Sequence, residues 1–179
     1  MKKLICTLLA LSLALAMTAC GGSKPEETTA PAANIEGTME ELLNKVIEQR
    51  PVEFAGGVYP IDLTDASEDG AWAVKSFTGL EDASQLKEAA AYEPMIGSIP
   101  FSMVMVRTTE GADPKAVAEA MKAGVDPRKW ICMEADDMKV AGCGDVVMLI
   151  MVSTSGDLTA QSFVDAFQSV AGRNCDFVI

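Results

Sequence analysis

Hydrophobic residues recur at helical spacing from residue 39 onward. Thr38 precedes them and Glu41 follows three positions later, which is the spacing of a capping box at a helix N-terminus. The helix is expected to end near Gln49, because Pro51 disfavours helical geometry in the residue before it. The expected buried face consists of Met39, Leu42, Leu43, Val46 and Ile47.

Two further helices are bounded by capping residues. Asp113 comes directly before Pro114, and Gly124 follows the last apolar position, which predicts a helix between them. Asp157 is the expected cap of a last helix that ends at Gly172. The expected inward-facing residues are Val117, Ala120 and Met121 in the first helix and Phe163, Val164, Phe167 and Val170 in the second.

Four segments have the composition of β-strands, namely 100–107, 130–134, 139–143 and 146–152. We expect the last three to follow one another with tight loops between them. Segment 146–152 is apolar at every position. Because such a strand is typically covered on both faces, we place it centrally in the sheet.

Residues 61–63 indicate a further short strand, an acidic loop follows it, and residues 84–91 indicate a short second helix. Helices interleaved with a late run of consecutive strands are typical of α+β domains. The sequence therefore predicts a single α+β domain with a mainly antiparallel sheet packed with three to four helices. A signal peptide and a disordered tether are expected to precede it.

The leader has a characteristic layout. Lys2 and Lys3 precede a thirteen-residue apolar run, 4–16, which leads through small residues to Cys20. This is the layout of a secretory signal, and the run is too short for a comfortable membrane span. A cysteine directly after small residues resembles a bacterial lipobox, in which Cys20 receives a diacylglycerol thioether, although Met17 stands where a lipobox usually has Leu. Two or more acyl chains hold a protein stably on a membrane. We expect Cys20 to carry at least two, including palmitate.

These patterns divide the chain into four parts. Residues 1–19 are the expected lipoprotein signal peptide, with an ordinary cleaved signal or an uncleaved membrane helix as alternatives. Residues 20–36 are the lipidated cysteine and a flexible linker, because they are polar, contain Pro and Gly, and lack an apolar period. The α+β domain covers 37–172, and 173–179 is a C-terminal tail that either frays or adds an edge strand.

Part of the chain resembles a known family. The strand–helix segment PFSMVMVRTTEGADPKAVAEAMKAG and the later strand GDVVMLIMVS, behind a lipobox and a short tether, are similar to an uncharacterised domain of small lipoproteins from Gram-positive anaerobes. The similarity is a pattern of elements over residues 37–171. It implies the same fold and location, and it transfers no catalytic residue to this chain.

Charge and composition exclude several kinds of partner and site. The chain carries 14 basic and 26 acidic side chains, a net charge of −12, and loss of Lys2 and Lys3 with the signal makes it more negative. This charge opposes binding to nucleic acid and to anionic lipid headgroups. There is no histidine. Its absence excludes Ser-His-Asp and Cys-His nucleophiles and histidine-containing zinc sites.

Two acidic clusters are candidate sites. Residues 65–72 match the opening of a calcium-binding loop, but its twelfth position is Ser76 instead of a bidentate Glu, which favours a solvated acidic turn. Glu134, Asp136 and Asp137 lie at the expected turn between strands 130–134 and 139–143. Paired carboxylates serve as acid and base when burial separates their pKa values. A solvated turn is the alternative there too.

Three cysteines, Cys132, Cys143 and Cys175, lie in the domain and its tail. In the expected hairpin Cys132 and Cys143 lie opposite each other, which brings their Cα atoms within the range of a disulfide. Secretion permits such a bond. The candidate disulfide is therefore Cys132–Cys143, and the alternative is that both are unpaired small apolar residues in strands.

The remaining patterns favour structure over chemistry. Met103 and Met105 share a strand face with Phe101, which favours core packing over a copper site. No catalytic, cofactor or metal site is expected. We expect a membrane-anchored extracytoplasmic lipoprotein that acts as a non-catalytic binding or interaction module for an envelope protein or a small-molecule ligand. The alternatives are a carboxylate-dependent envelope hydrolase and a structural envelope component.

Overall fold

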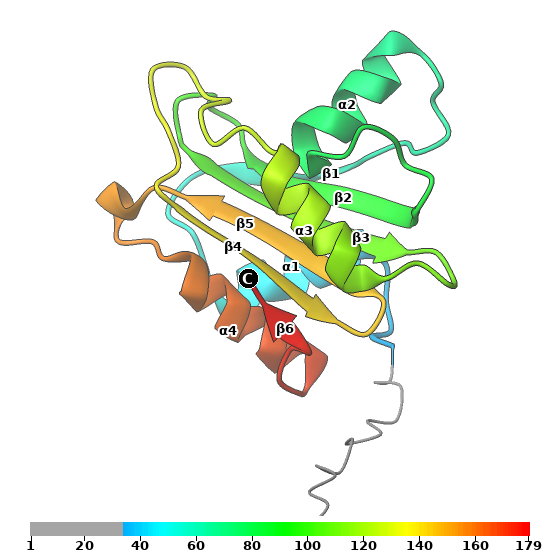
Figure 1. Ribbon diagram of the computed structural model, residues 1–179. Helices are drawn as coiled ribbons and strands as arrows, with labels where there is room; N and C mark the ends of the chain where they lie inside the picture. Colours follow the sequence, from blue (N-terminus) through cyan, green and yellow to red (C-terminus); the bar gives the residue numbers. More distant parts are fainter. Residues whose placement is uncertain (1–33) are drawn as a thin grey trace, which may run out of the picture.

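The computed structural model describes residues 34–179, in which a six-stranded antiparallel sheet lies between two layers of helices (Figure 1). The predicted α+β class is confirmed. The signal peptide, Cys20 and most of the linker lie outside the described residues. In sheet order the strands are β1 (Gly56–Pro60), β2 (Leu86–Pro94), β3 (Phe101–Thr108), β5 (Val146–Val152), β4 (Asp137–Cys143) and β6 (Phe177–Val178).

The central position predicted for segment 146–152 is confirmed. β5 pairs with β3 on one side and β4 on the other, and all seven of its residues are buried. Because side chains alternate along a strand, Met148 and Ile150 point into one core and Leu149 into the other. The run lacks polar positions because neither of its faces meets water.

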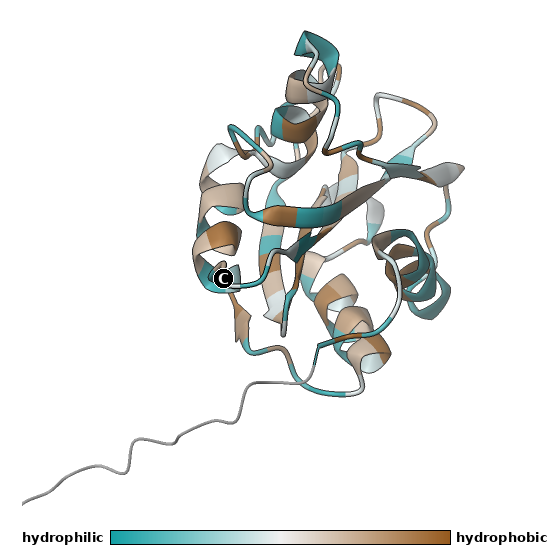
Figure 2. Cartoon of the chain, turned by 90° about the vertical axis from the view of Figure 1, so that its right-hand side faces the viewer, coloured by the Kyte–Doolittle hydropathy of each residue, from teal (hydrophilic) through white to brown (hydrophobic). Residues whose placement is uncertain are grey.

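Two helices cover each face of the sheet. α1 (Met39–Gln49) and α4 (Ala160–Ala171) pack on one side, and α2 (Glu68–Thr78) and α3 (Pro114–Gly124) lie on the other. Figure 2, turned by 90°, shows the strands between the helices, with hydrophobic residues concentrated on the strands and on the helix faces toward them. Burial of these faces closes two separate cores, one on each side of the sheet.

The helix starts follow from local capping. In the predicted capping box, the Thr38 hydroxyl accepts a bond from the Glu41 amide, and the Glu41 carboxylate accepts one from the Thr38 amide, each at 3.2 Å. Asp113 caps α3 as predicted. The cap of α4 is Thr159 instead of Asp157, because Asp157 has a left-handed backbone that ends a short 3₁₀ helix, η1 (Thr154–Gly156). The predicted end of α4 at Gly172 is confirmed.

Several predicted elements are wrong. The strand at 61–63 lies instead at 56–60, and the predicted helix at 84–91 is strand β2. Residues 86–91 contain good helix formers, but pairing with β1 and β3 on both sides outweighs that local preference. The predicted acidic loop after residue 63 leads into helix α2. Ser67 caps this helix, and two acidic residues lie in its first turn.

The predicted strand at 130–134 is reduced to one isolated bridge between Trp130 and Met133. Cys132 between them has φ +58°, which interrupts an extended strand. The tail forms an edge strand, the second of its two predicted alternatives: in β6, Phe177 pairs with Gly142 and Val178 with Ala141.

Candidate functional site

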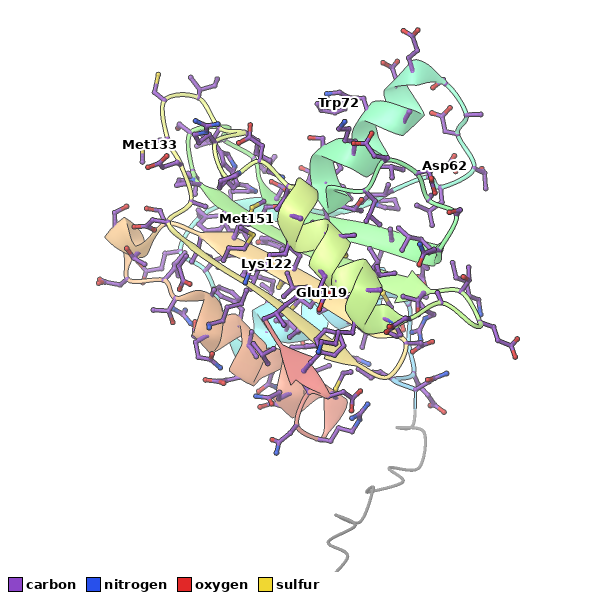
Figure 3. The ribbon with its side chains drawn as sticks, in the orientation of Figure 1. Asp62, Trp72, Glu119, Lys122, Met133 and Met151 are labelled. Carbon is purple, nitrogen blue, oxygen red and sulfur yellow. The ribbon has the colours of Figure 1, made fainter. Side chains whose placement is uncertain are left out.

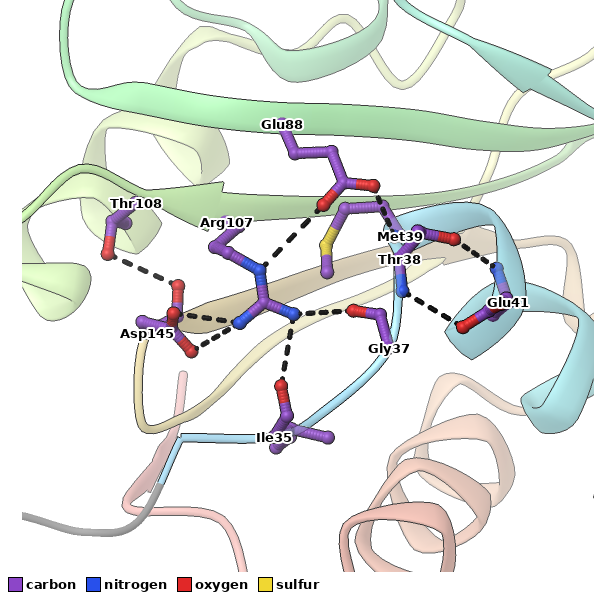
Figure 4. A network of polar contacts seen from close by, with 9 residues as sticks. All are labelled: Ile35, Gly37, Thr38, Met39, Glu41, Glu88, Arg107, Thr108 and Asp145. Carbon is purple, nitrogen blue, oxygen red and sulfur yellow. Dashed lines mark hydrogen bonds and ion pairs between the residues drawn. The ribbon is translucent and has the colours of Figure 1, made fainter.

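The first described residues are held at one end of the sheet (Figure 4). Arg107 lies near the end of β3, and its Nη2 donates to the carbonyls of Ile35 at 3.0 Å and Gly37 at 2.7 Å. Its Nη1 donates to both carboxylate oxygens of Asp145 at 2.8 Å. Asp145 belongs to the turn between β4 and β5. This network fixes where the chain reaches the domain.

Four loops gather at the opposite end of the sheet, which we call the loop end: 50–55, 95–100, 125–136 and 153–159. The strand register places them together, because Phe101 at the start of β3 pairs with Val152 at the end of β5, and Val152 pairs with Asp137 at the start of β4. Six residue steps along β3 separate Phe101 from Arg107, so at about 3.3 Å per residue the loop end lies about 20 Å from the Arg107 network.

A pocket of about 570 Å³ opens at the loop end. Its apolar wall includes Phe54, Ile99 and Leu158, and the Phe54 ring packs edge-on against Phe101 with ring centroids 5.1 Å apart. Its polar rim includes the hydroxyls of Ser98, Ser153 and Ser155 and the side chains of Arg50, Glu53 and Asp157. The pocket therefore combines an apolar wall with donors, acceptors and charges of both signs.

Arg50 is fixed at the pocket from several directions. Its Nε donates to the Ser162 hydroxyl at 3.1 Å, and its two terminal nitrogens donate to the carbonyls of Pro51 at 2.7 Å and Asp157 at 3.4 Å. The guanidinium also lies 5.4 Å from the centroid of the Phe163 ring. A guanidinium has five N–H groups and these bonds use three, so two N–H groups are free of these contacts in a position set by the fold.

Several exposed apolar side chains lie at the loop end. Met95 and Ile96 lie in the loop between β2 and β3, and Ile131 and Met133 lie in the loop between α3 and β4. Figure 3 labels Met133. The Ile131 amide donates to the Gly97 carbonyl at 3.3 Å, which connects the two loops. Ile131 is 74% exposed and Met95 72%. The loop end is thus the more apolar tip of a strongly acidic molecule.

Beneath these loops lies a buried polar cluster of Glu93, Ser102 and Lys129. Lys129 Nζ lies 3.0 Å from Glu93 Oε1 and 2.9 Å from the Ser102 hydroxyl, which in turn donates to Glu93. Burial raises the pKa of Glu93, and the Lys129 charge and the two hydrogen bonds act against that rise. The ammonium of Lys129 also faces the rings of Phe77 and Trp130.

A lysine bonded to a serine is one arrangement that activates a nucleophile. Here the Ser102 side chain has no exposed surface, because it projects from the middle of the sheet beneath α2 and α3. A substrate cannot reach that hydroxyl in this conformation. The cluster instead joins the loop around Lys129 to strands β2 and β3. The sequence signal for it was Ser102, a single polar residue inside the apolar run 101–106.

In the acidic stretch 65–72, side-chain oxygens accept hydrogen bonds from backbone amides of the same stretch. Asp65 accepts a bond from the Ser67 amide at 2.9 Å, and the Ser67 hydroxyl accepts one from the Gly70 amide at 3.2 Å at the start of α2. The hydrogen bonds from the side chain and the backbone of Ser67 lower the pKa of Asp65. Across residues 34–179, no group of three Cys, Asp or Glu side chains is placed to hold a metal ion.

The second acidic cluster is dispersed. Asp136 accepts bonds from the amide and the hydroxyl of Thr154, both at 2.7 Å, and these bonds lower its pKa. Asp137 accepts a bond from the Ala160 amide at the start of α4 at 2.8 Å. Glu134 is exposed. The two aspartates therefore secure the segment between β5 and α4, and the predicted turn around them is wrong, because β4 already begins at Asp137.

The structure does not bring Cys132 and Cys143 together. Cys132 is exposed in a loop before β4, and Cys143 is buried at the end of that strand. The hairpin that would oppose them is absent from the described residues, because the partners of β4 are β5 and β6. Cys132, Cys143 and Cys175 are all free thiols. Met103 and Met105 are fully buried beside Phe101, so core packing is confirmed for them.

Sequence reasoning missed the pocket, because its wall and rim come from loops with no periodic pattern. Within residues 34–179, no helix is both long and apolar enough to span a bilayer. Comparisons with family models, with curated proteins and with solved structures find no match to the chain.

Proposed function

We propose that the protein is a lipid-anchored extracytoplasmic binding module, held on the cell membrane through Cys20, and that its ligand occupies the pocket at the loop end. The supporting observation is the position of the pocket. It opens at the end of the sheet opposite the Arg107 network, which holds residues 35–37. A linker of about fifteen residues has a typical reach of about 20 Å, and because it joins the domain at the Arg107 end, it does not cover the loop end.

The pocket has the features of a small-ligand site. Its volume of about 570 Å³ falls within the ~300–1,000 Å³ range of such sites, and it combines apolar side chains with a few fixed polar groups. Phe54, Ile99 and Leu158 favour an apolar part of the ligand, while Arg50 offers N–H groups to an acceptor. The ligand is therefore a small amphipathic molecule or a peptide end with a hydrogen-bond acceptor.

Site-specific photocrosslinking in intact cells tests this proposal. A photoreactive residue at Ser155, on the pocket rim, is expected to capture a small adduct, and the same residue at Lys122, on the exposed side of α3, is the control (Figure 3). An adduct at Ser155 but not at Lys122 supports the proposal. Equal labelling at both positions, or none at either, contradicts it and favours the structural envelope component.

The anchor is tested separately. Cys20→Ala is expected to abolish incorporation of labelled palmitate and to block maturation of the precursor. Lys139→Ala, within the domain, is the matched control and keeps both properties. Palmitate on the Cys20→Ala protein would contradict the lipid anchor while leaving the pocket experiment unaffected.

The alternative of a carboxylate-dependent hydrolase has less support. Asp136 and Asp137, two of its three candidate residues, use their oxygens to hold Thr154 and Ala160. Neither carboxylate lines the 570 Å³ pocket.

A further inference from the structure

Two cysteines far apart in the sequence meet at the edge of the sheet. Cys143 ends β4 and is fully buried, and Cys175 lies just before β6 and is half-buried. The pairing of Gly142 with Phe177 and the bond from the Asp176 amide to the Gly142 carbonyl, at 2.7 Å, align these two segments. Both cysteines belong to the core on the side of α1 and α4.

The Cys143 thiol contacts the segment that carries Cys175. The Cys143 thiol donates to the carbonyl of Asn174, the residue before Cys175, at 3.7 Å. The Cys175 side chain lowers the pKa of Cys143, and the Cys143 side chain together with burial raises the pKa of Cys175. Each cysteine therefore lies close enough to the other to shift its pKa.

We propose that Cys143 and Cys175 form a redox site that closes to an intramolecular disulfide when it meets a small-molecule disulfide. One thiolate of the pair attacks the small disulfide, forming a mixed disulfide and releasing one small thiol. The second protein sulfur then attacks the mixed disulfide and releases the other small thiol. The two protein thiols are oxidised, the small disulfide is reduced, and the two protons leave on the two small thiols.

The surroundings indicate what this bond would change. β6 has only two residues, and the segment before it is held by an ion pair of 2.6 Å between Arg173 and Asp176 and by a bond from the Gly144 amide to Asp176. So short an edge strand is expected to open with a lower free energy than the central strands. A covalent link next to it would keep the C-terminal segment on β4. The site therefore couples the redox state of the surroundings to the order of residues 173–179.

Cys132 is not part of this site. It lies in the loop before β4, at the opposite end of that seven-residue strand from Cys143. At about 3.3 Å per residue, the length of β4 alone places the Cα atoms of Cys132 and Cys143 much farther apart than the two Cα atoms of a disulfide. Cys132 therefore serves as an internal control for thiol reactivity.

Peptide mapping tests the proposal with the full chain. The native protein is incubated with oxidised glutathione, the remaining thiols are alkylated, and trypsin is added without a reductant. Cleavage after Lys129, Lys139 and Arg173 separates the three cysteines into peptides 130–139, 140–173 and 174–179. The expected product is 140–173 linked to 174–179, lighter than the two free peptides by two hydrogen atoms. Reductant separates them again.

Matched variants sharpen the result. Cys132→Ser is expected to leave the linked product unchanged, and Cys175→Ser to abolish it. Oxidation is also expected to slow hydrogen exchange of residues 173–179 in the wild type and in Cys132→Ser, but not in Cys175→Ser. Free or merely glutathionylated Cys143 and Cys175 in the folded wild type would overturn the proposal, and so would a link between 130–139 and 140–173.

Discussion

Arg107 and Asp145 form a partly buried ion pair in which one guanidinium nitrogen lies 2.8 Å from both carboxylate oxygens. The pair joins β3 to the turn between β4 and β5, and Arg107 Nε also lies 3.8 Å from Glu88. The remaining terminal nitrogen holds the carbonyls of Ile35 and Gly37. Arg107 thus links the sheet to the segment that leads toward the predicted anchor.

Arg107→Ala is expected to lower the free energy of unfolding by about 1–3 kcal/mol, because it leaves the partly buried Asp145 carboxylate without its donor and removes the two bonds to the Ile35 and Gly37 carbonyls. Urea denaturation measures this loss. The control is Lys75→Ala, whose partner Glu81 is 80% exposed and whose pair contributes about 0–1 kcal/mol. Similar losses in the two variants would contradict the role assigned to Arg107.

Gly124→Ala tests the contact between α2 and α3. A Cβ on Gly124 would lie 2.0 Å from the carbonyl oxygen of Gly79, which ends α2 with a positive φ. Alanine normally favours a helix over glycine, but here it pushes two backbones apart, so we expect a loss of about 1–3 kcal/mol. Thermal unfolding measures it. Gly97→Ala, where a Cβ meets nothing within 4 Å, is expected to change stability by less than about 1 kcal/mol.

Gly142→Ala tests the edge strand β6. A Cβ on Gly142 would lie 2.1 Å from the Phe177 ring, so the ring must move and β6 is expected to detach from β4. The amides of Asp176 and Ile179, which donate to the Gly142 and Val140 carbonyls, should then exchange with solvent faster. Hydrogen exchange measures this. Gly156→Ala, with open space around it, should leave both amides protected.

The elements predicted correctly are those that local chemistry specifies. The capping box at Thr38 and the proline after Asp113 determine helix starts within a few residues. The apolar run of β5 likewise encodes burial on both faces. β2 was predicted as a helix because its alanines and Glu88 favour one, and only the neighbouring strands β1 and β3, distant in sequence, make it extended.

The candidate sites depend on contacts that no local pattern contains. The pocket brings Arg50, Ser98 and Leu158 together from three loops. The sequence predicts a Cys132–Cys143 disulfide because segments 130–134 and 139–143 resemble the two strands of a hairpin. In the structure the pairing of β4 with β6 instead brings Cys175 near Cys143. Both arrangements follow from the strand order, and strand order is decided by tertiary packing.

The buried cluster of Glu93, Ser102 and Lys129 makes stability depend on pH in a direction opposite to that of most paired carboxylates. Burial raises the pKa of Glu93 above 4.5, so the folded protein holds this proton at pH values where the unfolded chain has lost it. Stability from this group therefore falls as the pH rises from 4.5 through the folded pKa and is constant above it. Asp136 and Asp176, whose hydrogen bonds lower their pKa, contribute stability that is lost as the pH falls below 3.8.

Glu93→Gln removes the Glu93 contribution and is expected to flatten the decline above pH 4.5, which denaturation at a series of pH values measures. The carboxyl carbon of Glu93, followed by NMR, should titrate above 4.5 in the wild type. Ser102→Ala is the directional control: the Ser102 hydrogen bond lowers the pKa of Glu93, so its loss must raise that pKa further. A decline above pH 4.5 that persists in Glu93→Gln would show that Glu93 is not the group responsible. A Glu93 pKa that falls in Ser102→Ala would contradict the direction assigned to the Ser102 hydrogen bond.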